Sequence, residues 1–166
     1  LMDSQIIAGS GTGESNGLIN ATNTMTTAGT TSITADEVID FYMSLGRTAR
    51  ARGFFVFNDS TIGALRKLKS TDDQYLWAPG LAAGDPSTLM GRPVYSSANV
   101  GALGAGNKVA IFADPDAYIL RQVGTSMAIS RSDEYAFDQD LISWKAAVRI
   151  DGDIVDQSAV SVLVNV

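Results

Sequence analysis

Residues 9–17, GSGTGESNG, form the stretch of this chain whose residue types suggest chemistry. Gly13-Glu-Ser-Asn-Gly17 matches the nucleophile-elbow pattern, in which a strand runs directly into a reactive serine and a helix leaves it. Loop-forming residues precede Ser15 instead, and the sequence contains no histidine that could activate its hydroxyl. No Ser-x-x-Lys pair offers a substitute base. We therefore interpret the match as chance within a turn.

A phosphate site in the same segment is disfavoured by the spacing of its glycines. A phosphate-binding loop ends in Gly-Lys-Ser/Thr, and a dinucleotide fingerprint needs glycines at spacings of about two and then three residues. The third glycine of such a fingerprint would fall on Glu14 or on Asn16. A carboxylate at Glu14 would repel a phosphate, so these glycines predict a structural turn.

Acidic residues recur between positions 133 and 156 and could bind a hard cation. They are Asp133, Glu134, Asp138, Asp140, Asp151, Asp153 and Asp156. Asp151-Gly-Asp153 resembles a fragment of a calcium loop, but it lacks the spaced ligands and the terminal glutamate of one. The absence of cysteine and histidine removes thiolate and imidazole ligands. We expect no catalytic residue, no cofactor and no metal site, and we keep a carboxylate- or metal-dependent enzyme as the alternative.

The composition is that of one main globular domain. Of the 166 residues, 45% are hydrophobic and 18% are charged, which argues against wholesale disorder. The net charge of −6 argues against a surface made to bind nucleic acid. No apolar run approaches the roughly 20 residues of a membrane-spanning helix, and the start, LMDSQIIAGSGTG, lacks the pattern of a signal peptide. We expect a soluble, intracellular protein.

Among the elements that would position any site, the clearest is at residues 141–150, the longest stretch in which the side chains alternate with a period of two. Its apolar residues alternate with the others and are Ile142, Trp144, Ala146, Val148 and Ile150. This period of two predicts a strand about 33 Å long with one buried face, on which Trp144 is a core aromatic. A strand of this length suggests an extended architecture.

Two helices and a central strand are predicted in the first half of the chain. Thr34 and Glu37 have the spacing of a capping box, which predicts a helix that runs to about Gly46, with the basic residues 47–52 near its end. The aromatic run 53–57 predicts a strand buried on both faces in the middle of a sheet. Residues 58–61 then offer helix N-caps for a second helix.

The other expected elements are short. We predict strands at 5–8, 94–96, 108–113, 118–121, 127–131 and 159–164, and loops at 9–17, 20–32, 72–79, 80–86, 90–93, 99–107 and 153–156. Trp77 lies in one of these loops, where an exposed aromatic side chain would anchor an interface. Burial of Trp77 against its own domain is the equally supported alternative.

The order of these features resembles the C-terminal portion of the major capsid proteins of tailed bacteriophages, the HK97-like family. The segments that carry the resemblance are Gly11-Thr-Gly-Glu14, Gly17-Leu-Ile-Asn20, Phe55-Val-Phe-Asn-Asp-Ser-Thr61, Ala64-Leu-Arg-Lys-Leu-Lys69, Gln74-Tyr-Leu-Trp77, Leu89-Met-Gly-Arg-Pro-Val94, Ile111-Phe112, Tyr118-Ile119, Ser132-Asp-Glu-Tyr-Ala-Phe137 and Val148-Arg-Ile-Asp-Gly152. Each segment is weak alone, but together they extend over nearly the whole chain.

The resemblance implies an α+β fold of HK97-like type. An axial domain with a central sheet flanked by helices would comprise residues 1–126 and 153–166, and residues 127–152 would form a peripheral-domain strand region. The family's N-terminal arm, extended loop and spine helix would all precede Leu1. The spine helix and extended loop would then cover the apolar face of residues 142–150.

The resemblance also implies a function as a structural subunit that joins other copies of itself in pentamers and hexamers around packaged DNA. The protein would lie in the virion, and in the host cytoplasm before assembly, without specific nucleic-acid binding and without a membrane. Tyr75, Trp77 and Arg92 would lie at subunit interfaces. Some family members form a Lys-Asn crosslink with the help of an acidic residue. The asparagine position here would fall near Asp140 and that of the assisting acid near Ala147, neither residue type matches, and the loop that carries the lysine would precede Leu1, so we predict no crosslink. A phage tail or connector adaptor is a further alternative.

Overall fold

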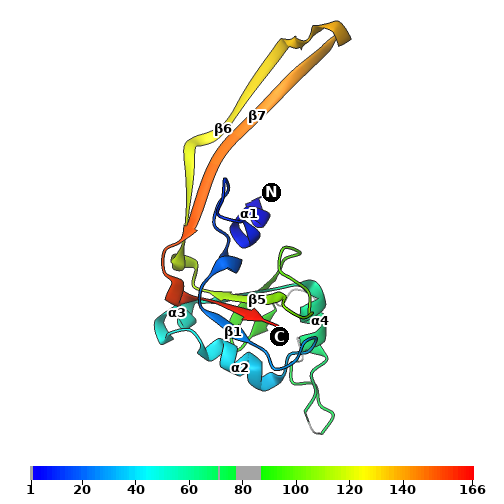
Figure 1. Ribbon diagram of the computed structural model, residues 1–166, viewed down its shortest axis with the longest axis vertical. Coiled ribbons are helices and arrows are strands. Elements are labelled where there is room, and N and C mark those ends of the chain that lie inside the picture. The colour runs from blue at the N-terminus through cyan, green and yellow to red at the C-terminus, as the bar shows by residue number, and fades with distance from the viewer. Residues whose placement is uncertain (1, 71, 78–86) are drawn as a thin grey trace.

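The computed structural model describes residues 2–70, 72–77 and 87–166, which form a body and a long protruding ribbon (Figure 1). The helices of the body are α1 (Met2–Ala8), α2 (Ala35–Met43), α3 (Arg47–Arg52) and α4 (Asp59–Arg66), with 3-10 turns η1 (Leu18–Asn20), η2 (Pro115–Ala117) and η4 (Gln157–Ala159). Its strands are β1 (Thr24–Thr26), β2 (Phe54–Phe57), β3 (Thr88–Leu89), β4 (Arg92–Ser96), β5 (Lys108–Ala113) and β8 (Val160–Val164). The ribbon consists of β6 (Tyr118–Ala136) and β7 (Leu141–Ile154), joined by η3 (Phe137–Gln139).

Within the described residues, the strands of the body form one mixed sheet in the order β1-β8-β5-β2-β4-β3. β5 lies antiparallel between β8 and β2, whereas β1 pairs with β8 and β4 pairs with β2 in parallel. The prediction that residues 53–57 form a strand in the middle of a sheet is therefore confirmed. The predicted closing strand is confirmed as well, because β8 returns to this sheet.

Helices α2 and α4 cover one face of the sheet. Phe55 of β2 lies opposite Phe112 of β5, with ring centroids 4.2 Å apart and planes inclined by 15°. Phe41 of α2 packs against both rings, and Leu65 of α4 belongs to the same buried cluster. Burial of these side chains supplies the main apolar contribution on this side of the body.

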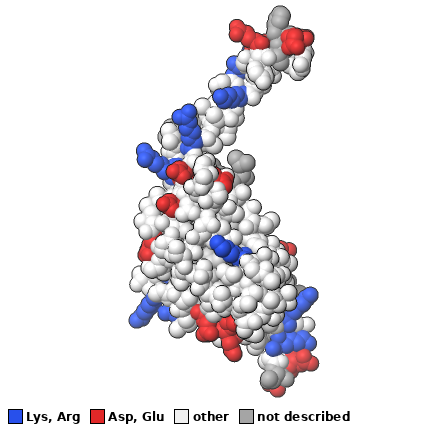
Figure 2. All heavy atoms as spheres, viewed as in Figure 1, with Lys and Arg blue, Asp and Glu red and all other residues white. Residues whose placement is uncertain are grey.

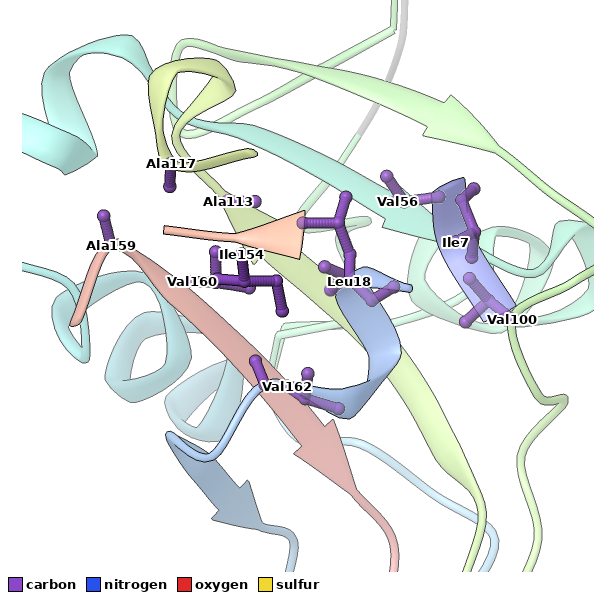
Figure 3. Packing of buried hydrophobic residues seen from close by; sticks show 12 residues of the cluster. Ile7, Leu18, Val56, Val100, Ala113, Ala117, Ile154, Ala159, Val160 and Val162 are labelled. Atoms are coloured by element: carbon purple, nitrogen blue, oxygen red, sulfur yellow. The ribbon is translucent and has the colours of Figure 1, made fainter. Parts of the chain in front are cut away.

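The opposite face of the sheet is covered by α1, η1 and the base of the ribbon. Ile7 of α1, Leu18 of η1 and Ile154 of β7 gather with Val160 and Val162 of β8 in a second buried cluster (Figure 3). The ribbon therefore leaves the body from a packed base.

Side-chain caps begin two of the helices, as the sequence predicts. The amide of Glu37 donates to the Thr34 hydroxyl over 3.3 Å, and the amide of Thr34 donates to the Glu37 carboxylate over 2.7 Å, which completes the capping box of α2. Asn58 accepts a hydrogen bond from the amide of Ser60 over 3.1 Å and caps α4.

One predicted strand is a helix, and one helix was not predicted. Residues 5–8, predicted as a strand, belong to helix α1, because a run as short as Gln-Ile-Ile-Ala fits a strand and a buried helix equally well. The basic run 47–52 forms a helix of its own, α3, between Gly46 and Gly53. Arginine and alanine favour helix, but this run has no apolar residues at helical spacing from which a helix could be predicted.

Residues 118–121 and 127–131 were expected as separate strands, and they form one strand, β6, of 19 residues. From the sequence, Gly124 suggests that a strand ends there. In the structure Gly124 has a φ of 84° and lies where the pairing of β6 with β7 shifts register, between Val123 and Ala128. A bulge of this kind bends a strand without ending it. Residues 78–86, which contain part of the predicted loops, lie outside the described residues.

The predicted buried face of residues 142–150 is wrong in this structure. The alternation is correct, but Ile142 is 55% exposed and Trp144 is 67% exposed, so Trp144 is not a core aromatic here. No layer of described residues packs against this face beyond the base of the ribbon. Among residues 2–70, 72–77 and 87–166, no helix is long and apolar enough to cross a membrane.

Candidate functional site

The glycine-rich loop 9–17 is a compact structural unit. The Ser15 hydroxyl donates to the carbonyl of Gln5 over 2.8 Å and is buried, so it is not presented to a substrate. The amide of Gly17 donates to the carbonyl of Gly9 over 2.9 Å. A Cβ at Gly17 would lie 2.6 Å from the backbone nitrogen of Gly9, which explains the glycine there. The structure agrees with the interpretation of this segment as a turn.

The same loop holds the base of the ribbon. The amide of Asn16 donates to the carbonyl of Gly152 over 2.8 Å, and the side-chain amide of Asn16 donates to the Asp153 carboxylate over 2.9 Å. Gly152 has no room for a side chain, because a Cβ there would lie 2.4 Å from the Tyr118 hydroxyl. We call the contacts of Asn16 with Gly152 and Asp153 the root clamp. No motif in the sequence pointed to it.

The carboxylates of the candidate calcium fragment are used in local hydrogen bonds. Asp151 accepts from the amide of Gly152, and Asp153 accepts from the amide of Ile154 as well as from Asn16. In the part of the chain that the structure describes, no group of three or more His, Cys, Asp or Glu side chains is placed to hold a metal ion. These carboxylates lie within β7 and make local contacts at the base of the ribbon.

A polar cavity of about 730 Å³ lies beside α3 and η4. On its wall, Arg52 contacts the buried Asp114 carboxylate over 2.7 Å, and the hydrogen bond to Asp114 raises the pKa of Arg52. Hydrogen bonds from Ser158 lower the pKa of Asp156 on the same wall. The Arg52–Asp114 ion pair therefore links α3 to the residue that precedes η2.

The three predicted interface residues lie on the body. Tyr75 is 59% exposed, and the Lys69 ammonium lies 5.3 Å from the centre of its ring. Trp77 is half-buried against the cluster beneath α2 and α4, with the Arg66 guanidinium 5.6 Å from its ring. Arg92, at the start of β4, donates to the carbonyl of Ala51 in α3. Both readings of Trp77 stay compatible with this placement.

An apolar groove of about 300 Å³ adjoins Trp77, and no sequence pattern predicted it as a whole. It is lined by α2, α4 and the β3–β4 turn, with Ile39, Leu68, Leu76, Trp77, Leu89 and Met90 among its residues. Ile39, Leu76 and Met90 are exposed. Only the apolar spacing on α2 signalled part of this surface in advance.

One face of the ribbon presents apolar side chains to solvent, with Arg131 and Gln122 interspersed among them. Residues paired across an antiparallel ribbon lie on the same face, and Ile129 pairs with Ala146 while Gln122 pairs with Ile150. Ile129, Ile142 and Trp144 are all more than half exposed on this face. Exposed apolar surface of this extent marks a site of interaction.

A sequence model of the phage capsid family matches residues 1–165 of the chain. No curated protein is significantly similar in sequence. Among solved structures, the capsid of an empty GTA particle, computed with C5 symmetry, is 28% identical with a TM-score of 0.86 over 98% of this chain and 60% of that chain. The capsid of the native GTA particle is 27% identical, with a TM-score of 0.87 over 98% of this chain and 59% of that chain.

More distant structures share the fold. A chain of Gordonia phage Cozz is 15% identical with a TM-score of 0.71 over 99% of this chain and 58% of that chain. The holo-SrpI encapsulin complex of Synechococcus elongatus is 14% identical, with a TM-score of 0.69 over 98% and 59% of the two chains. This chain therefore spans about 60% of the length of the structures that it matches.

Proposed function

Because the chain belongs to the phage capsid family, we propose that it forms part of a structural subunit of an icosahedral phage head. Copies of the subunit would join in pentamers and hexamers that enclose packaged DNA. The fold, a central mixed sheet with flanking helices, is that of HK97-like capsid proteins. The protein would lie in the host cytoplasm before assembly and in the virion afterwards, with no specific binding of nucleic acid and no membrane.

The observation that carries this proposal is the exposed apolar face of the ribbon. A face with Trp144 at 67% exposure and Ile142 at 55% exposure favours aggregation unless another surface covers it. We propose that the spine helix and extended loop of the family supply part of that cover. A subunit built for assembly needs complementary surfaces and no catalytic group.

We further propose that residues 1–126 and 153–166 form the axial domain and residues 127–152 the peripheral strand region. The bulge at Gly124 lies beside this boundary and supports it. The boundary is nevertheless crossed by continuous strands, because β6 begins at Tyr118 and β7 ends at Ile154. The peripheral region would then be the outer part of the ribbon.

Tyr75, Trp77 and Arg92 are proposed as contacts between axial domains. The exposure of Tyr75 and the apolar groove beside Trp77 support the first two. Arg92 is proposed from the resemblance alone, because its guanidinium donates to the carbonyl of Ala51 in the same chain. Nothing on the described surface favours the alternative of a metal-dependent enzyme. The alternative of a tail or connector adaptor is distinguished from a shell subunit by whether the protein forms particles.

Electron microscopy of the protein expressed together with its upstream sequence tests the proposed function. We expect closed particles, whereas a soluble protein that forms only rings or stays monomeric under all conditions would contradict a shell subunit.

Tyr75→Ala tests the contacts, because it removes an exposed ring without opening the core. We expect fewer particles at an unchanged melting temperature, while Tyr95→Ala, which removes a similarly exposed ring from β4, serves as the control.

A further inference from the structure

The polar face of the ribbon carries cations along its shaft. Side chains alternate in a strand, so Lys145, Ala147 and Arg149 of β7 share one face, opposite to that of Trp144. Arg121 of β6 lies on the same face, because it pairs with Asp151. The side chains of the three cations are exposed, and none is in an ion pair with another described residue.

The far end of the ribbon carries the opposite charge. The acidic side chains at this tip are Asp133, Glu134, Asp138 and Asp140. Only Asp133 is in an ion pair within the described residues, with Arg131. Figure 2 shows the separation: Lys and Arg side chains follow the shaft, and Asp and Glu side chains gather at the tip.

We propose that the acidic tip of one copy docks on the cationic shaft of a second copy. The proposal rests on the proposed function, in which copies of this chain assemble, and it names the surfaces through which two ribbons meet. Each copy would present its tip to one neighbour and its shaft to another. Such a heterologous contact closes into a ring or continues as a chain of subunits.

The length of the cationic stretch favours a second copy over nucleic acid as its partner. Lys145 and Arg149 are about 13 Å apart along the strand. Asp151 and Asp153 follow on the side of the base, and the acidic residues of the tip follow on the other side. A polyanion laid along the ribbon would meet repulsive carboxylates at both ends of this stretch, whereas a compact acidic tip would not.

Charge reversal tests the contact in particles assembled from the full-length protein. Lys145→Glu with Arg149→Glu places acidic residues on the shaft, and Glu134→Lys with Asp138→Lys places basic residues on the tip. We expect each pair alone to slow assembly at least about tenfold, because like charges face one another across the contact. All four substitutions in one chain restore opposite charges, and we expect assembly to recover.

The control for this experiment changes the net charge equally on another surface. Arg47→Glu with Lys67→Glu reverses two exposed cations of the body, and we expect assembly close to that of the unmodified protein. Thermal unfolding of every variant checks that the fold is retained. Equal slowing by this control pair would assign the effect to net charge and would overturn the proposal.

Thiol trapping locates the contact directly, because the sequence contains no cysteine of its own. Gln139→Cys marks the tip and Ala147→Cys marks the shaft, and neither removes a charged residue. Mild oxidation of particles that contain both variants should yield a disulfide-linked dimer between them, and the shaft reversal should reduce its yield at least about tenfold.

The outcomes separate this proposal from the proposed function. If no particles form from the unmodified protein, the shell function itself fails. If particles form but the mixed disulfide is absent and both reversals are harmless, the tip-to-shaft contact is wrong and the shell function stands. If shaft reversal lowers only the retention of DNA while tip reversal has no effect, nucleic acid is the partner and the proposal is overturned.

Discussion

At the scale of single residues, the capping box of α2 stabilises the start of that helix. Thr34→Ala removes the acceptor for the amide of Glu37, and we expect a loss of about 1 kcal/mol in the free energy of unfolding. Urea unfolding of the chain measures this loss. Thr31→Ala, a nearby exposed position outside the capping box, is the control and should change the stability by much less.

Acid should weaken the same capping box. Burial alone would raise the pKa of Glu37, but hydrogen bonds from the amides of Thr34 and Ala28 outweigh it, and the pKa lies below its usual value. The carboxylate therefore contributes stability that is fully present above about pH 4.5 and is lost as the pH falls through the lowered pKa. Glu37→Gln should reduce the dependence of stability on pH in this range. An unchanged dependence would exclude a role for Glu37.

The buried hydroxyl of Tyr118 lies near the Ser15 hydroxyl, but it makes no hydrogen bond of ordinary geometry among the described atoms. Its burial also raises the pKa of the phenol. An unpaired buried hydroxyl costs about 1 to 3 kcal/mol, so Tyr118→Phe should leave the free energy of unfolding unchanged or increase it. Chemical unfolding beside Tyr95→Phe, an exposed control, measures the difference, and a clear loss of stability would reveal a partner for the hydroxyl.

Local residue patterns predicted local structure well. Thr34 with Glu37 and Asn58 with Ser60 each act within three residues of sequence, so the caps could be read directly. Rejecting Ser15 as a nucleophile also needed only the absence of histidine. The root clamp could not be found in this way, because Asn16 and Asp153 are 137 positions apart and neither belongs to a recognised motif.

At the scale of elements, the aromatic layer between the sheet and α2 holds the body together. Phe112 is fully buried and stacks on Phe55, so Phe112→Ala should cost roughly 3 to 5 kcal/mol through lost contacts and a cavity. Phe54, the half-buried residue that precedes Phe55 in β2, offers the control, since Phe54→Ala should lower the free energy of unfolding by less. Equal losses at both positions would show that the layer does not carry this stability.

The ribbon should be the least protected element of the isolated chain. Beyond its base, its amides are covered only by the partner strand, and its apolar face is exposed. We expect the amides of residues 127–150 to exchange with solvent faster than those of β5 and β8. Hydrogen exchange followed by mass spectrometry tests this, and a ribbon more protected than the sheet would contradict it.

Elements with a strong period or a cap were predicted from the sequence, and those without were not. β2, β5 and β8 combine apolar runs with β-branched or aromatic residues. α3 contains Arg, Thr and Ala alone, and the type of α1 was ambiguous over the four residues read as a strand. For β7, the alternation gave the correct faces, but a period reports which residues share a face and not whether another layer covers it.

At the scale of the whole molecule, the chain presents three surfaces for contact with other copies or with further polypeptide. They are the apolar groove beside Trp77, the apolar face of the ribbon and the charged polar face of the ribbon. The family could be identified because many weak segments occur in the right order over the whole chain. The surfaces themselves could not, because they combine residues from elements that lie far apart in the sequence.

The root clamp makes the ribbon a lever arm. At about 3.3 Å per residue, β7 extends about 36 Å from Gly152 at the clamp to Leu141, so a swing of about 5° at the clamp would move the tip by about 3 Å. The hydrogen bonds of Asn16 thus hold the pivot on which the position of the tip depends. If the subunit assembles as proposed, a small change at this one loop would fit it to the curvature of both pentamers and hexamers, with the sheet and its core left intact.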